Sequence, residues 1–185
     1  MLAVTRPIEL LDTALNALRT ERDWRSVLDR FEVPTYTTDA HGAVTYWNRA
    51  CVDFAGREPE LGKDRWCVTW QLYATTGERM PHEDCPMAET IRTRKEVRGK
   101  VAIAMRPDGT RRAFTPYPAP IFDESGEFSG AVNLLVDISD EQARGLREQA
   151  SRCRRLARST NDQQASDILR RMAVVYADTA ESLDH

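Results

Sequence analysis

The sequence contains no long apolar run. Neither end carries a stretch with the length of a signal peptide or of a membrane-spanning helix. We therefore expect a cytoplasmic protein with no membrane partner. The 26 Lys and Arg residues and the 29 Asp and Glu residues give a formal net charge of −3, so no global basic field favours nucleic acid as a partner.

The chain also lacks the spaced motifs of common metal sites and catalytic sites. Its four cysteines show no paired short spacing, so the sequence indicates neither a zinc knuckle nor a disulfide framework. No Gly-x-x-x-x-Gly-Lys loop, metalloprotease helix or Gly-x-Ser-x-Gly elbow occurs. A histidine kinase would need a phosphoacceptor histidine in its exit helices, and none lies between Gln142 and Asp184. We therefore do not expect an enzyme.

What is present supports one domain of typical size with helical additions, because 41% of the 185 residues are hydrophobic. The clearest pattern lies in the second half. Pro107-Asp108-Gly109 predicts a turn, since proline presets its φ and glycine takes a positive φ at no steric cost. An antiparallel meander of three strands is expected there, over about 97–105, 111–122 and 128–138.

The last strand of this meander leads directly into a helix. The run from Ala131 to Val136 shows too little alternation for a strand with one wet face, which predicts a central strand covered on both sides. Ser139 fits the N-cap of the next helix, and Gln142 completes a capping box. We expect Asp137, Ser139 and Gln142 to pass a change in the sheet to this helix.

The first half predicts helices followed by a hairpin. Apolar residues at helical spacing predict an amphipathic helix from Pro7 to about Glu21, and the same period continues from Trp24 to Phe31. Such faces pack on the domain or on a dimer partner. Residues 33–47 predict a β-hairpin, and Asn48 is the expected N-cap of a helix that ends at Gly56.

The middle of the chain is less regular. We expect a single helical turn at 58–62, an irregular aromatic segment at 63–80 and a helix over 81–94. The second meander strand carries prolines at 116, 118 and 120. A central strand does not tolerate them in its ladder, so this strand is predicted to be an edge or to be bulged.

In order, the chain predicts two strands, several short helices, three strands and an exit helix, and this order resembles the PAS domain. TTDAHGAVTYWNRACVDFAG resembles the PAS opening, in which an Asp-x-x-Gly turn joins two strands and an Asn starts the first helix. RPDGT resembles the strand turn of the family's second half. GAVNLLVDIS resembles its last strand and Asp-Ile-Thr exit, with Ser139 in the threonine position.

The resemblance covers about Phe31 to Asp140. It implies an α+β fold, with a five-stranded antiparallel sheet covered by short helices and flanked by amphipathic helices. We therefore expect N-terminal helices at 1–31, a PAS domain at 32–140 and C-terminal helices at 141–185. The resemblance further implies a sensor or interaction module whose ligand lies between the sheet and the helices.

Flavin and haem are the cofactors to weigh. A light-sensing flavin subclass carries a reactive Cys in an Asn-Cys-Arg-Phe-Leu-Gln type helix, and the segment 62–68 contains Cys67 without that pattern, so flavin is not expected. Haem in this family typically uses a histidine on the helix before the meander, where His82 falls, and Cys85-Pro86 resembles a haem-responsive Cys-Pro motif. Alternatively, His82 is a polar first-turn residue, Cys85 a core residue and Pro86 a helix-start proline.

A ligand pocket would draw its lining from large, apolar or polarizable side chains in both halves of the chain. Aromatic residues of this kind are more often ordinary core, and that interpretation stays open. The candidate ligand-binding residues are His82, Cys85, Met87, Trp66, Trp70, Tyr46, Ile103 and Leu134.

Two amphipathic helices follow the domain, over about 141–158 and 163–183, and Ser159 to Asp162 breaks the first and caps the second. They form either an intrachain hairpin or a coiled coil between chains. The stripe of the second helix includes Ile168, Met172 and Val175. A basic cluster between Arg152 and Arg158 is usually a solvated face. A helix-turn-helix reader is the alternative, but balanced charge in the tail argues against nucleic acid as a partner.

Two functional hypotheses remain for a cytoplasmic PAS protein of bacterial style. In the first, a small molecule or haem binds between sheet and helices and changes how the terminal helices associate. In the second, the domain is solidly packed and acts as an adaptor. Both include a homodimer through the terminal helices, and the adaptor docks a partner such as a kinase or a response regulator.

Overall fold

The computed structural model describes residues 7–183, so the ends of the predicted N-terminal and C-terminal segments lie outside the described residues. The helices are α1 (Pro7–Thr20), α2 (Trp24–Leu28), α3 (Arg49–Ala55), the 3₁₀ helix η1 (His82–Asp84), α4 (Pro86–Thr93), α5 (Ser139–Ser159) and α6 (Gln163–Glu181). The strands are β1 (Thr35–Asp39), β2 (Val44–Trp47), β3 (Gln71–Tyr73), β4 (Arg79–Met80), β5 (Ala102–Met105), β6 (Arg111–Pro116), β7 (Ala119–Phe122) and β8 (Phe128–Asp137).

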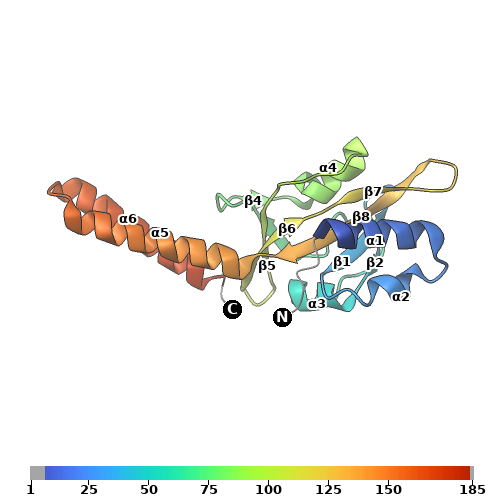
Figure 1. The fold of residues 1–185 in the computed structure, drawn as a ribbon, viewed down its shortest axis with the longest axis horizontal. Coiled ribbons are helices and arrows are strands. Elements are labelled where there is room, and N and C mark those ends of the chain that lie inside the picture. Colours follow the sequence, from blue (N-terminus) through green and yellow to red (C-terminus); the bar gives the residue numbers. More distant parts are fainter. Residues whose placement is uncertain (1–6, 184–185) are drawn as a thin grey trace.

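The strands form one antiparallel sheet in the order β2-β1-β8-β6-β5-β3-β4, with β7 also paired to β8 (Figure 1). The predicted α+β fold of the PAS type is confirmed, and the N-terminal hairpin lies beside the last strand of the meander. The sheet has eight strands where five were predicted. The segment expected to be irregular contributes the short strands β3 and β4, and the second meander strand is divided into β6 and β7.

The division of the second meander strand follows from its prolines. β6 pairs with β8 up to Pro116, and β7 resumes this pairing at Ala119. Between them, the backbone N–H of Tyr117 donates to both the Leu134 carbonyl and the Asn133 side chain. A register shift follows between Ile121 and Phe122. The prediction of an edge or bulged strand is confirmed.

Both faces of the sheet are covered, and β8 packs on both sides. Ala131 and Leu135 face a core under α3, η1 and α4, whereas Val132 and Leu134 face a second core under α1 and α2. This confirms the prediction from the unbroken apolar run, because a strand buried on both faces needs no polar alternation. In the part of the chain that the structure describes, no helix combines the length and apolar character needed to cross a bilayer.

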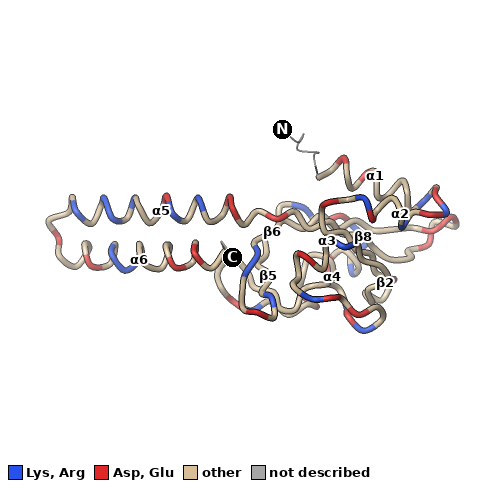
Figure 2. The backbone as a smooth tube through the Cα atoms, turned by 90° about the horizontal axis from the view of Figure 1, so that it is seen from below, with Lys and Arg blue, Asp and Glu red and all other residues tan. Residues whose placement is uncertain are grey.

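The helices α5 and α6 fold back on each other as an intrachain hairpin that projects from the sheet (Figures 1 and 2). Small residues repeated every seven positions are buried between them: Ala143, Ala150 and Ala157 on α5, and Ser166, Ala173 and Ala180 on α6. Cys153 is the other buried residue in this part of α5. The Ser166 hydroxyl donates to the Ala157 carbonyl at 2.8 Å. As predicted, Asp162 caps α6, accepting from the N–H groups of Gln164 and Ala165.

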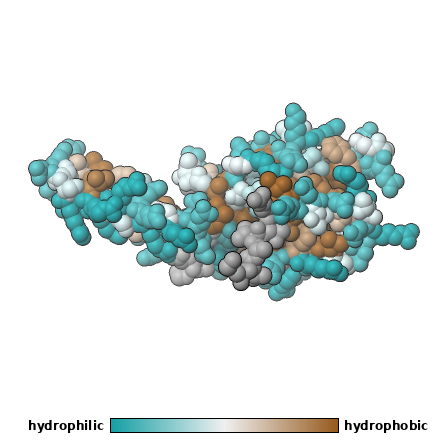
Figure 3. All heavy atoms as spheres, in the orientation of Figure 1, coloured by the Kyte–Doolittle hydropathy of each residue, from teal (hydrophilic) through white to brown (hydrophobic). Residues whose placement is uncertain are grey.

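The predicted apolar stripe of α6 does not form the contact between α5 and α6. Ile168, Met172 and Val175 are 43%, 40% and 61% exposed. Small side chains let two helix backbones approach closely, and the larger side chains are then left outside the contact. Figure 3 shows an apolar patch near the far end of an otherwise hydrophilic arm.

Several local predictions also need correction. Asn48 starts α3, but its side chain makes no cap; it accepts from Thr35 N and donates to the carbonyls of Leu28, Phe31 and Val33, fixing the chain before β1. The segment 58–62 forms a turn without a helix. The predicted helix over 81–94 is η1 followed by α4, because Pro86 starts a new helix behind Cys85.

Candidate functional site

The candidate site is the space between the sheet and the layer formed by α3, η1 and α4. Apolar side chains fill it, and the largest of the buried ones are Tyr36, Phe54, Leu72, Met87, Phe114 and Leu135. Among residues 7–183, the buried polar side chains are Thr, Asn and Ser, without a charged group. An anionic or cationic ligand placed there would lack a counter-charge, and burying an unpaired charge is costly. The interior therefore suits an uncharged group.

A chain of hydrogen bonds crosses this interior. Asn133 Nδ2 on β8 donates to the Tyr36 hydroxyl at 3.0 Å, and that hydroxyl donates to the Trp66 carbonyl at 2.8 Å. Asn133 Oδ1 accepts from Tyr117 N at 3.0 Å. Burial, reinforced by Cys67 and Cys85, raises the pKa of Tyr36 well above its usual value. The phenol stays protonated and links the loop at Trp66 to the strand that leads into α5.

Three thiols lie around this chain. Burial raises the pKa of Cys51, of Cys67 and of Cys85, the last to about 12. The Cys67 sulfur lies 3.2 Å from the Thr69 hydroxyl, and the Cys85 sulfur accepts from Ala88 N as the N-cap of α4. Since the thiolate is the reactive form, these are structural thiols. In residues 7–183, no cluster of three or more His, Cys, Asp or Glu residues has the arrangement of a metal site.

The residues proposed for haem do not form a porphyrin slot. His82 is half-buried in η1, and its Nε2 lies 3.4 Å from the Thr69 hydroxyl. Burial and the nearby Arg57 lower the pKa of His82, which favours the neutral imidazole. Cys85 is committed to capping α4, with Pro86 as a helix-start proline. Because Met87 and its neighbours fill the space beneath, this packing does not fit haem.

Three buried polar atoms of the interior have no hydrogen-bond partner among the described residues. They are Thr38 Oγ1, Trp47 Nε1 and Thr90 Oγ1. Trp47 pairs with Tyr36 across β1 and β2, and Thr38 follows Tyr36 on the same face of β1. Thr90 lies one turn after Met87 on α4. A buried unsatisfied donor or acceptor costs about 1–3 kcal/mol, so these atoms mark where a small hydrogen-bonding molecule would be stabilised.

The predicted ligand-binding residues are divided among several environments. Trp66, Cys85 and Met87 belong to or pack against the interior core, and Trp70 is 45% exposed. Tyr46 and Leu134 lie on the opposite face of the sheet, where Tyr46 donates to Asp29 at 2.6 Å and stacks edge-on with Trp24. Ile103 packs at the base of the hairpin, near Ala143 and Ala180. The structure therefore does not gather the predicted set around one pocket.

A β-bulge explains the placement of Tyr46. The register of β1 and β2 shifts between Thr37 and Thr38, so that Val44 and Trp47 face the interior while Tyr46 faces α2. Sequence reasoning missed Tyr36, Thr38, Thr90 and Asn133. One signal was present for Asn133, because it is the single polar residue in the apolar run of β8.

The junction between β8 and α5 contains the predicted relay residues. Asp137 Oδ1 accepts from Ser139 N at 2.9 Å, and Asp137 Oδ2 lies 3.7 Å from Arg112 Nη1. The Ser139 hydroxyl accepts from Ala113 N on β6 at 3.0 Å. The predicted capping box is wrong, because Ile138 is the N-cap and Gln142 N simply donates to the Ile138 carbonyl. Ser139 instead ties the first residue of α5 to the sheet.

The fold agrees with comparisons against known proteins. The PAS domain of the fruit-fly ELK potassium channel shares 15% identity and a TM-score of 0.50, covering 62% of this chain and 93% of that one. A PAS domain from Colwellia psychrerythraea shares 19% identity and a TM-score of 0.47, covering 62% of this chain and 92% of that one. A LOV protein from Rhodobacter sphaeroides shares 13% identity and a TM-score of 0.46, covering 92% of this chain and 96% of that one. At 15% identity, the similarity to the ELK channel domain shows the fold alone. No curated protein matches the chain.

The profile of the family described as PAS fold matches residues 28–143, which is more than half of the chain. The match includes both strands of the N-terminal hairpin, the interior with its hydrogen-bond chain and the start of α5. The chain therefore belongs to the PAS-fold family.

Proposed function

We propose that this PAS protein is a sensor that binds a small uncharged molecule in its interior and relays the binding to its helical hairpin. PAS domains are generally sensory modules without an enzymatic activity, and the family assignment supports this role. The absence of buried charge among the described interior residues supports a neutral ligand, and Thr38, Trp47 and Thr90 offer it hydrogen bonds.

The observation that carries the proposal is the chain from Trp66 through Tyr36 and Asn133 to Tyr117. A ligand that competes for the Tyr36 hydroxyl changes what Asn133 bonds. Asn133 is on β8, and four residues later β8 ends at Asp137, whose side chain holds the first N–H of α5. A ligand shifts a conformational equilibrium only as far as its affinities for the two conformations differ. The hydrogen bond between Asn133 and Tyr36 is a contact that can differ between them.

The proposed output is association of two hairpins through the apolar patch, defined as Ile168, Met172 and Val175. These side chains are 40% to 61% exposed, and Ile168, Met172 and Val175 line one shallow hollow with Arg171 and Tyr176. Helices that carry an uncovered apolar stripe commonly associate by packing these stripes together. A second copy of the chain is the proposed occupant, because it offers the same stripe to a two-fold partner.

An adaptor without a ligand is the second candidate, and the filled interior favours it. The side chains of Tyr36, Leu72 and Met87 are buried almost completely, as expected of a core that is packed without a bound ligand. In this case the hairpin still dimerises or docks a kinase or a response regulator, but the interior only holds the fold.

The relay is tested by replacing Tyr36 with Phe. The expected result is faster amide hydrogen exchange in residues 128–142, because Asn133 loses the phenol it binds. Tyr46→Phe is the matched control: it also removes a buried phenol that donates to one acceptor, but on the opposite face of the sheet. If both variants change exchange in 128–142 equally, the interior has no special connection to α5.

Mass spectrometry of the freshly purified protein, under native and then denaturing conditions, separates the sensor from the adaptor. A released small molecule supports sensing. A protein that carries no extra mass, together with unchanged exchange in Tyr36→Phe, supports the adaptor.

The output is tested by Met172→Glu, which places a charge in the centre of the patch. We expect the protein to become monomeric in light scattering, because a carboxylate buried between two apolar stripes is costly. Gln164→Glu adds the same charge to an exposed position of α6 outside the patch and keeps the dimer. A dimer that survives Met172→Glu would remove the hairpin as the interface.

A further inference from the structure

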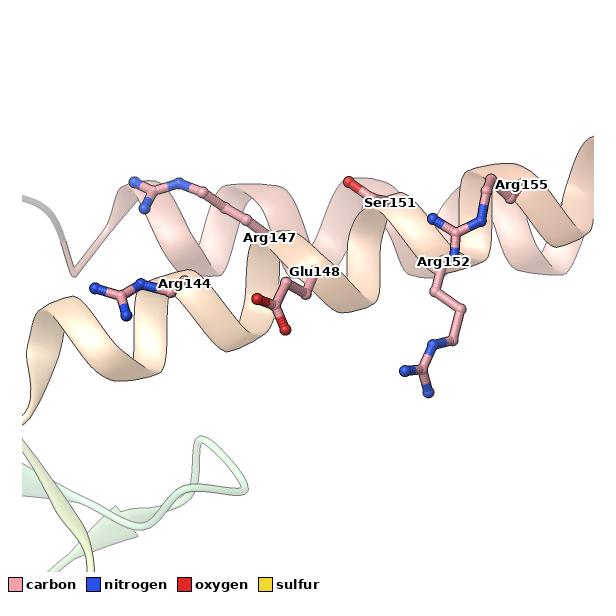
Figure 4. A pocket seen from close by; sticks show the side chains of 6 residues that line it. All are labelled: Arg144, Arg147, Glu148, Ser151, Arg152 and Arg155. Atoms are coloured by element: carbon pink, nitrogen blue, oxygen red, sulfur yellow. The ribbon is translucent and has the colours of Figure 1, made fainter.

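The outer face of α5 carries a hollow of a different kind from the apolar patch. It is lined by Arg144, Arg147, Glu148, Ser151, Arg152 and Arg155. Figure 4 shows the four arginine side chains extending from α5, with Glu148 between the first and second pair along the helix. No residue of this lining is apolar, and the proposed relay to the hairpin uses none of them.

The charge of this helix differs from that of the rest of the chain. The whole of α5 contains six arginines and three acidic residues, a formal charge of +3. Two of these acids, Asp140 and Glu141, lie in its first turn, so residues 142–159 carry a formal charge of +5. The whole chain has a formal net charge of −3, so the remaining residues carry −8. A concentrated positive segment on a negative protein creates a local field that attracts anions to this helix and not to the body.

Three of the arginines lie on the side of α5 that faces away from α6. Ala143, Ala150 and Ala157 are buried in the hairpin, and Arg144, Arg152 and Arg155 lie roughly 120° to 160° around the helix from them. At 1.5 Å per residue, Arg144 and Arg155 are about 17 Å apart along the helix. Figure 2 shows arginine positions recurring along α5. The result is a basic face about three helical turns long.

We propose that this face docks an acidic helix of a partner protein, with carboxylates repeated every three or four residues. Arginine binds carboxylates through two parallel hydrogen bonds, and a helix laid along α5 presents its carboxylates at the same spacing as the arginines. Glu148, in the middle of the face, would pair with a single basic residue of such a helix.

The same observations disfavour other anionic partners. A nucleic acid carries a phosphate at every nucleotide. Its backbone would be repelled by Glu148 at the centre of the face and by the remaining residues of the chain, which carry a formal charge of −8. A membrane-surface helix needs apolar residues beside its basic ones, and this lining has none. A mixed pattern of several cations and one anion is typical of protein–protein contacts, where it fixes register.

The experiment uses the full chain and three fluorescent probes at low salt: a helical peptide with glutamates along one face, the same peptide with glutamines, and a duplex DNA of about two turns. We expect the glutamate peptide to bind, with affinity that falls as salt is added, and the glutamine peptide not to bind. Tighter binding of the DNA than of the glutamate peptide, or no binding of the glutamate peptide, would overturn the proposal.

Paired variants locate the site. Arg144→Glu with Arg155→Glu is expected to weaken the glutamate peptide at least tenfold. Lys95→Glu with Lys100→Glu makes the same change in net charge at two exposed loop positions and leaves the affinity near that of the wild type. Equal losses in the two double variants would mean that only net charge matters, which overturns the site.

Glu148→Gln provides a test that does not depend on disrupting the helix. Removal of the one acidic side chain of the face is expected to tighten binding of the all-glutamate peptide about threefold, since a like charge is lost. Weaker binding in Glu148→Gln would contradict the proposed orientation of charges.

Discussion

The interior of the domain and the helical hairpin bury opposite kinds of residue. The interior buries large side chains such as Leu72, Met87 and Leu135, and the Tyr36 hydroxyl there bonds the Trp66 carbonyl and the Asn133 side chain. The hairpin buries alanine, serine and Cys153 and leaves its large side chains outside. The domain therefore covers its large apolar side chains within one chain, whereas the hairpin leaves an apolar patch and a basic face exposed.

The largest effect is expected from Leu135→Ala in the interior. Leu135 is fully buried on the central strand, so its truncation removes apolar contacts and leaves a cavity. We expect a loss of about 2–5 kcal/mol in the free energy of unfolding, measured by urea denaturation. Leu61→Ala, at an exposed position, is the control and is expected to change stability by less than about 0.5 kcal/mol. Similar losses at the two positions would contradict the description of the interior as the core.

A smaller effect is expected from Ala173→Leu in the hairpin. The added methyl groups would separate α5 from α6 at a contact built from alanines, at a cost of about 1–3 kcal/mol. The signature is faster hydrogen exchange confined to 139–181, with the sheet still protected. Val174→Leu enlarges an exposed neighbour and serves as the matched control. If Ala173→Leu unfolds the sheet together with the hairpin, the two regions form one cooperative unit and the comparison fails.

The smallest effect concerns the edge of the interior at His82. Burial lowers the pKa of this imidazole below its unfolded value of about 6.5, so the unfolded chain binds more protons as the pH falls below that value. Stability that is fully present above about pH 6.5 is therefore lost gradually at lower pH. Thermal unfolding followed from pH 7.5 to 5 should show a shallower decline for His82→Gln than for the wild type. Identical slopes would show that His82 remains as accessible to protons in the folded state as in the unfolded one.

The order of elements could be predicted because it depends on local chemistry. The Pro-Asp-Gly turn, the Asp-x-x-Gly turn and the apolar run of β8 each specify a strand or a reversal from adjacent residues, and the structure contains all three. The prolines after Thr115 likewise predicted the break in the meander, since proline cannot donate to a strand ladder.

The site was harder to predict because its members meet only through tertiary contacts. A one-residue bulge in the first hairpin places Tyr46 on the opposite face of the sheet, and the sequences of β1 and β2 give no sign of this bulge. Asn48 and Ser139 fit the local pattern of a helix cap, yet each bonds a more distant partner. On α6, the usual rule that large apolar residues face inward failed because a seven-residue repeat of small residues packs more closely.

Because α5 is attached to β6 at its near end, a change of angle there would displace its far end. Ser139 fixes the near end of a helix of 21 residues, which extends for about 30 Å. A tilt of about 5° at that attachment would displace the far tip by about 2.6 Å, close to half the pitch of an α-helix. A small rotation at the junction would thus be enlarged, at the tip, to a displacement at least as large as the shifts of helices at subunit interfaces, which are about 1–2 Å.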